Sequence, residues 1–155
     1  MVEEGTVRRL LRVIEKRLAR LEKLVGTPLE AYLADMDLQD VVERNLELVI
    51  QACLDLGIHV LADRASAPPE THRAVFRLLV DEGVVDPELG GRLEAMAGFR
   101  NRLVHEYADL LPEKVHGYLA ELDDVRRYVR EVVDHLTAEG LFGGADRSEP
   151  GNSPR

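Results

Sequence analysis

One short stretch of the sequence concentrates side chains that suit the chemistry of a phosphodiester bond. Residues 98–107 read Gly-Phe-Arg-Asn-Arg-Leu-Val-His-Glu-Tyr and hold two arginines, an asparagine, a histidine and a tyrosine. A histidine moves protons near neutral pH. An arginine holds phosphate oxygens and stabilises charge that develops on them, without a metal ion. This stretch is therefore the first candidate for a reactive site.

The spacing of these groups limits how they can meet. At about 100° per residue, Arg100 and His105 lie roughly 140° apart on an ideal helix and do not converge. Asn101 and His105 share one face, and Arg100 and Tyr107 share another. Either the helix bends here, or the working site combines groups from two copies of the chain across a symmetric interface. The alternative to a reactive site is that Arg100 and His105 are only a surface ion pair and a capping histidine near a helix end.

Hydrophobic periodicity predicts the elements that must position these residues. No segment of useful length alternates with period two, and no β-hairpin signal joins two such segments. Glycine and proline separate stretches of helical period. The sequence therefore predicts an all-α protein, an up-and-down bundle of four to five helices. The helices are expected at about 6–24, 38–63, 70–82, 88–107 and 112–139, with a short helical turn around 29–34.

The longest predicted helix, 38–63, is apolar over much of its circumference, which is typical of a central helix with several neighbours. Asp37 is its expected N-cap. Its narrow polar stripe includes Glu47, Gln51 and Asp55, at spacings of four. These side chains either line the same cleft as the reactive stretch, or form a solvated strip or hydrogen-bond partners for arginines in the bundle. The pattern alone leaves both interpretations open.

Composition indicates one folded domain with an aliphatic core, because the 155 residues are 45% hydrophobic and include no tryptophan. We expect residues 1–139 to form this domain and residues 140–155 to be a disordered tail. The single cysteine, Cys53, excludes an internal disulfide, is compatible with the cytoplasm and lies on an apolar stripe, so it is predicted to be a core residue. No apolar run approaches the roughly 20 residues that span a bilayer, and no secretory signal is expected.

The histidines do not indicate a metal site, because they are dispersed along the chain. No phosphate-binding glycine loop or other cofactor signature is present either, so we expect neither a metal nor a cofactor. The histidines outside the reactive stretch are interpreted as structural or surface residues. They are His59, His72, His116 and His135.

The net charge of −9 argues against a general binder of nucleic acid, because affinity for phosphate is largely electrostatic. The first predicted helix is a local exception, with seven basic and two acidic residues between positions 8 and 23, a balance of +5. This basic face either guides RNA backbone or docks an acidic partner, or it is simply a solvated helix face. Its members are Arg9, Arg12, Lys16, Arg20 and Lys23.

The pattern Arg-x-x-x-x-His-x-Tyr, carried here by Arg100, His105 and Tyr107, resembles the signature of HEPN domains. The trailing tyrosine is similar to that of the HepT-type toxins among them. Residues 43–55 resemble the long second helix of that family, and the resemblance covers about residues 10–136 in the same helix order. It implies an HEPN-like helical fold and a symmetric homodimer.

The resemblance also implies a function: the toxin of a HepT/MNT type VII toxin–antitoxin system, a metal-independent endoribonuclease of the cytoplasm. Arg100 and His105 would be its catalytic pair in a dimer cleft, with His105 as general acid or base and Arg100 stabilising the transition state. Asn101 would orient the imidazole or the phosphate. Tyr107 would accept adenylyl groups from an MNT-type nucleotidyltransferase antitoxin, which would place bulk and negative charge beside the cleft.

Two other functions stay open on the sequence. The first is a non-catalytic helical subunit that presents substrate or nucleotide to a nucleotidyltransferase. The acidic charge and the scarcity of aromatic side chains for base stacking favour it. The second is a structural oligomerisation bundle, which leaves the cluster of arginine, histidine and tyrosine unexplained.

Overall fold

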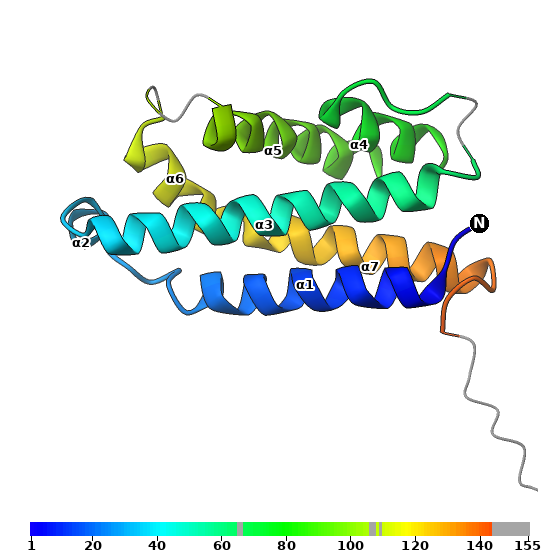
Figure 1. The fold of residues 1–155 in the computed structure, drawn as a ribbon, viewed down its shortest axis with the longest axis horizontal. Helices are drawn as coiled ribbons and strands as arrows, with labels where there is room; N and C mark the ends of the chain where they lie inside the picture. The colour runs from blue at the N-terminus through cyan, green and yellow to red at the C-terminus, as the bar shows by residue number, and fades with distance from the viewer. Residues whose placement is uncertain (65–66, 106–107, 109, 144–155) are drawn as a thin grey trace, which may run out of the picture.

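A computed structural model describes residues 1–64, 67–105, 108 and 110–143, and these residues form a helical bundle (Figure 1). No β-strand occurs among them, and none of their helices is long and apolar enough to cross a membrane. The predicted all-α bundle is confirmed. The long elements are α1 (Glu4–Glu22), α3 (Met36–Leu61), α4 (His72–Asp81), α5 (Pro87–His105) and α7 (Leu122–Ala138), and the short ones are α2 (Leu29–Leu33), α6 (Pro112–Tyr118) and the 3₁₀ helix η2 (Leu119–Glu121).

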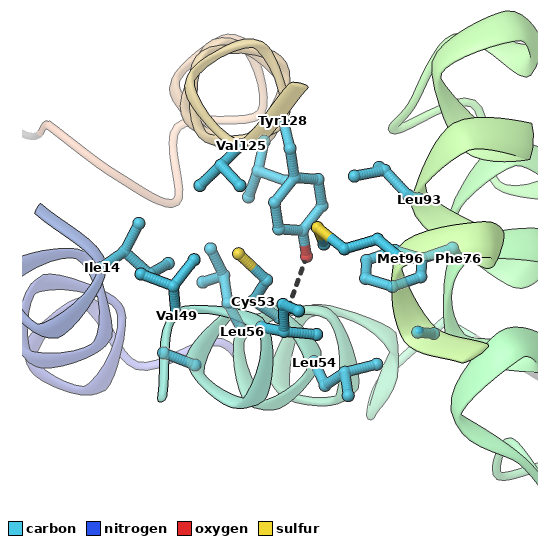
Figure 2. Close-up of a cluster of buried hydrophobic side chains, with 14 of the residues drawn as sticks. Ile14, Val49, Cys53, Leu54, Leu56, Phe76, Leu93, Met96, Val125 and Tyr128 are labelled. Atoms are coloured by element: carbon cyan, nitrogen blue, oxygen red, sulfur yellow. Dashed lines mark hydrogen bonds between the residues drawn. The ribbon is translucent and has the colours of Figure 1, made fainter. Parts of the chain in front are cut away.

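Helix α3 runs through the middle of the bundle, with α1 packed along one side and α4 and α5 along the other (Figure 1). Figure 2 shows Tyr128 of α7 pointing between α3 and the α4–α5 pair. Its hydroxyl donates a 2.8 Å hydrogen bond to the carbonyl oxygen of Cys53, and its ring meets that of Phe76 edge to face at 5.6 Å. Cys53 is fully buried, which confirms it as a core residue, and burial raises the pKa of its thiol.

The chain segment predicted as one helix over 112–139 is broken, which corrects that prediction. Helix α6 ends at Tyr118, η2 follows, and α7 begins at Leu122. Tyr118 stacks on Phe99 of α5 with ring centroids 3.8 Å apart, at the point where the chain changes direction. Leu119, the first residue of η2, and Leu122, the first residue of α7, are both buried. The apolar spacing therefore continues through η2, and periodicity carries no sign of the interruption.

The N-cap of α3 is also different from the prediction. The side chain of Asp35, not that of Asp37, accepts a 3.0 Å hydrogen bond from the backbone N–H of Leu38. Asp37 lies in the first turn instead, where a negative side chain interacts favourably with the positive end of the helix dipole. Either acidic residue suits the start of a helix, so the local sequence did not distinguish them.

The residues that directly follow α7 cap the helix and contact the core. Gly140, with φ 72°, donates to the carbonyl of Thr137, and Leu141 donates to that of Leu136. This pair of bonds is a Schellman cap. Phe142 packs against the core, with the guanidinium of Arg8 4.9 Å from its ring centroid. Residues 140–143 are therefore part of the fold, while 144–155 lie outside the described residues.

Candidate active site

Helix α5 carries the reactive stretch, and its start is well defined by the sequence. Pro87 occupies the first helical position, as predicted, and Asp86 before it accepts a 3.1 Å hydrogen bond from the N–H of Glu88. The helix continues without interruption to His105. Arg100 and His105 therefore leave one continuous helix on faces roughly 140° apart. The helix is not broken before His105, and the two arrangements that the sequence allowed, a bend and a site shared between two chains, both stay predictions.

Arg100 is half-buried, on the face of α5 that also carries the buried Leu93 and Ala97. The Nε atom of Arg100 is buried and has no hydrogen-bond partner among the described residues. A buried donor without an acceptor costs free energy, on the order of 1–3 kcal/mol. The side chain as a whole is only half-buried and forms no ion pair within the described part of the chain, so the accessible part of the guanidinium can bind an anion.

Asn101 contacts a histidine that the sequence analysis had set aside. The Nδ1 of His72 lies 2.9 Å from the Oδ1 of Asn101. His72 is the first residue of α4, after the N-cap Thr71, whose hydroxyl accepts from the N–H of Ala74. Residues 72 and 101 come together only because α4 and α5 pack side by side (Figure 1). No spacing within either helix could have revealed this contact.

A second residue of α4 lies against the same stretch. The guanidinium of Arg73 occupies the place where a side chain at Gly98 would begin, since a Cβ there would meet its Nη2 and Cζ atoms. Burial raises the pKa of Tyr118, and the positive charges of Arg102 and Arg73 act in the opposite direction. Both arginines are therefore close to the Phe99–Tyr118 stack.

His105 is exposed and ends α5, on the face that it shares with Asn101. An exposed imidazole at this position is accessible to a substrate. Tyr107, the residue that the resemblance assigns as adenylyl acceptor, lies outside the described residues.

The polar stripe of α3 forms its own contacts. Gln51 donates a 2.8 Å hydrogen bond to Asp55, and Glu47 forms an ion pair of 3.4 Å with Arg44. Within the described part of the chain, no hydrogen bond or ion pair joins these residues to Arg100, Asn101 or His105. The structure of one chain thus does not connect the stripe with the reactive stretch, and a shared cleft stays a prediction.

A groove of about 560 Å³ lies beside the reactive stretch, between α3, α5, α6 and α7. Its floor is apolar and includes Ile50, Met96 and Phe99, and its rim carries the positive side chains of Arg102 and Lys114. No group of three or more histidine, cysteine, aspartate or glutamate side chains suited to a metal ion is found among the described residues.

The basic face predicted on the first helix is fully exposed on α1. Its five members are all exposed, whereas neighbouring basic residues are engaged: Arg8 pairs with Glu4 at 2.5 Å and Arg17 bonds Asn45 at 3.4 Å. This exposure fits a surface that meets a charged partner, although it equally fits a solvated face.

Comparison with known sequences identifies a family. A family model described as ribonuclease HepT-like matches residues 14–132. A tRNA nuclease HepT of Aphanizomenon flos-aquae is 32% identical over 136 residues, which covers 87% of this chain and 92% of the relative. An mRNA nuclease HepT of Shewanella oneidensis is 29% identical over 117 residues, which covers 75% of this chain and 87% of the relative.

Solved structures share the fold. A toxin–antitoxin complex with AMP-PNP matches with a TM-score of 0.76 and 24% identity, over 83% of this chain and 97% of the other. A tri-AMPylated Shewanella oneidensis HEPN toxin in complex with MNT antitoxin matches with a TM-score of 0.76 and 24% identity, over 84% and 98%. The Bacillus subtilis protein YutE matches with a TM-score of 0.77 and 20% identity, over 90% and 94%. These likenesses confirm the HEPN-like fold.

Proposed function

Because the chain belongs to the ribonuclease HepT-like family, as its sequence pattern predicted, we propose that it is the toxin of a toxin–antitoxin pair. It cleaves RNA without a metal ion, and an MNT-type nucleotidyltransferase antitoxin holds it in check in the cytoplasm. The observation that carries this proposal is the end of α5, where the arginine and histidine of the family-like pattern are available for substrate. Arg100 is half-buried and forms no ion pair with the described residues, and His105 is exposed.

The chemistry follows from these two groups. His105 as general base takes the proton of the 2′-hydroxyl, whose oxygen attacks the adjacent phosphorus. Arg100 stabilises the negative charge that builds on the phosphate oxygens. The bond from phosphorus to the 5′-oxygen breaks, and the leaving oxygen takes a proton from the imidazolium form of His105. The products are a 2′,3′-cyclic phosphate and a 5′-hydroxyl end.

A symmetric homodimer can bring together Arg100 and His105, which lie on different faces of α5 within one chain. Arg100 and His105 diverge on one chain, so a site that uses both combines Arg100 of one chain with His105 of its partner. Apolar side chains surround the motif and suit such an interface: Leu111 is 54% exposed, and Leu103, Val104 and Leu110 are partly exposed.

Tyr107 is the proposed point of control. It follows His105 by two residues, so an adenylyl group attached there would add bulk and negative charge next to the imidazole. That charge would repel the phosphates of RNA. A related solved structure is a tri-AMPylated HEPN toxin bound to MNT antitoxin, which supports the same control for this chain.

The test is cleavage of total cellular RNA by the purified protein with EDTA present. Wild type is expected to leave cyclic phosphate ends, while Arg100→Ala and His105→Ala are expected to lose cleavage. Arg130→Ala, which changes an exposed arginine of α7, is the matched control and should cleave like wild type. Failure of unmodified, dimeric wild type to cleave would contradict the enzyme and favour a non-catalytic binding subunit.

A further inference from the structure

The first turn of α4 brings two basic side chains onto the reactive stretch of α5. His72 contacts Asn101 at 2.9 Å across a separation of 29 residues. The guanidinium of the next residue, Arg73, lies against Gly98. Neither belongs to the Arg-x-x-x-x-His-x-Tyr pattern, and together they place α4 at the site.

The chemistry of the two atoms fixes the direction of the first contact. An amide oxygen only accepts hydrogen bonds, so Nδ1 of His72 carries the hydrogen and donates it to Oδ1 of Asn101. Nδ1 keeps this hydrogen in the protonated ring as well, so the bond holds in both charge states. No hydrogen bond of the Asn101 amide NH₂ group to another described residue is observed, so this group can donate to a substrate acceptor.

The hydrogen bond from His72 orients an amide that lies on the same face of α5 as His105. Asn101 and His105 are one turn apart on the same side of α5, so the amide lies on the face that presents the exposed imidazole. A phosphate oxygen bound there would accept from the amide NH₂. Without His72, the Asn101 side chain would lose the contact that selects its orientation.

Arg73 adds positive charge to the same face. Gly98 lies one turn before Asn101 and Arg102 and two turns before His105. Other arginines nearby are neutralised, Arg77 by Glu94 at 2.8 Å and Arg92 by Asp124 at 3.2 Å. Arg73 and Arg102, in contrast, form no ion pair with any carboxylate in the described part of the chain. They are thus suited to bind RNA phosphate.

We propose that the first turn of α4 completes the cleavage site: His72 is a positioning residue that holds the Asn101 amide toward the scissile phosphate, and Arg73, seated on Gly98, binds RNA phosphate. This inference rests on the ribonuclease function proposed above. It assigns roles to two residues outside the sequence pattern.

The role of His72 is tested with a double-mutant cycle on the cleavage rate at saturating RNA. His72→Ala and Asn101→Ala should each slow cleavage about tenfold, the equivalent of one lost hydrogen bond. The double variant should be no slower than the slower single variant, because both changes remove the same contact. Losses that multiply to about a hundredfold would overturn the positioning role.

A conservative variant separates positioning from proton transfer and from a merely structural role. His72→Asn supplies an amide N–H near the position of Nδ1. It should restore most of the rate and leave the pH–rate profile in its wild-type shape. No rescue, or loss of one limb of the profile, would show that the imidazole acts in another way, and would overturn the proposal.

The role of Arg73 is tested by RNA affinity as a function of salt, with a single-stranded oligonucleotide whose 2′-hydroxyls are absent. Arg73→Gln and Gly98→Ala should both weaken binding and reduce the slope of log K against log salt by about 0.7. Gly91→Ala is the matched control, since Gly91 is on the same helix with open space around its Cβ position. An unchanged slope in Arg73→Gln would contradict the phosphate contact.

RNA cleavage by the wild-type protein distinguishes failure of the α4 proposal from failure of the ribonuclease function on which it rests. If wild type does not cleave RNA, both fail together. If wild type cleaves while the His72 and Asn101 losses multiply and the Arg73 slope is unchanged, only this inference fails.

Discussion

The hydroxyl of Tyr128 and the backbone carbonyl oxygen of Cys53 are joined by a 2.8 Å hydrogen bond that ties α7 to the middle of α3 (Figure 2). Both residues are completely buried. Burial raises the pKa of the Tyr128 phenol well above its usual value, so the hydroxyl keeps its proton and remains a donor. The hydrogen bond therefore holds α7 against α3 in the core of the bundle.

Removal of this hydroxyl should destabilise the protein without unfolding it. Tyr128→Phe keeps the ring and its edge-to-face contact with Phe76, and loses only the hydrogen bond. We expect the free energy of unfolding to fall by about 0.5–1.5 kcal/mol. Urea denaturation followed by circular dichroism measures this change, and equal midpoints for variant and wild type would contradict it.

A pH-dependent contribution to stability is expected at the C-terminal end of α7, where Arg64 bonds Glu139. The guanidinium of Arg64 donates to the Glu139 carboxylate at 2.8 Å, which holds the pKa of that carboxyl below its usual value. A carboxyl with a depressed folded-state pKa stabilises the fold above its unfolded pKa, and the contribution is lost as pH falls through the folded value. Stability from this pair should therefore be fully present above about pH 4.5 and be lost progressively as the pH falls below that value.

The measurement is the difference in unfolding free energy between wild type and Glu139→Gln, taken at about pH 7.5 and at a series of pH values below about 4.5. Wild type should be the more stable protein at the higher pH, and the difference should shrink as the pH falls. A difference that stays constant over this range would mean that the carboxylate charge is not what stabilises the contact.

The sequence predicted what is local. Helical periodicity located the long helices, Pro87 marked the start of α5, and the pattern from Arg100 to Tyr107 pointed to the family. Continuity of apolar spacing, however, concealed the break at η2, because Leu119 within it and Leu122 directly after it are both buried.

Contacts between helices lie beyond such reasoning. His72 was interpreted as a structural or surface residue, because its own helix gives no indication that Asn101 lies 2.9 Å away. Similarly, the sequence gives no indication that the guanidinium of Arg73 occupies the space that a side chain at Gly98 would fill. Periodicity shows which residues share one face of a helix, but only the folded structure shows which residues of another helix contact that face.

Mixing two inactive variants tests the composite site directly. In a mixed dimer of Arg100→Ala and His105→Ala chains, one site receives both intact residues and the other receives neither. Random mixing makes half of the dimers mixed, so about a quarter of the wild-type activity should return. Cleavage assays on co-refolded chains measure this, with each variant refolded alone as the control. No recovery would mean that Arg100 and His105 do not act across the dimer in this way.

The exposed basic face of α1 is predicted to strengthen the binding of RNA to an otherwise acidic protein. Reversal of Arg12, Lys16 and Arg20 to glutamate removes three cations that lie on one side of the helix. If each contacts a phosphate of single-stranded RNA, the slope of log K against log salt should become less steep by about 2, at roughly 0.7 for each contact.

The fold should tolerate this reversal, because all three side chains are exposed while the opposite face of α1 carries the buried Val7, Ile14 and Leu18. Circular dichroism and the unfolding midpoint provide that control. Glu15→Lys, an exposed change of opposite sign on the same helix, should tighten RNA binding. If neither the triple reversal nor Glu15→Lys alters the affinity or its salt dependence, the basic face is a solvated surface, and RNA reaches the site by the α4–α5 side alone.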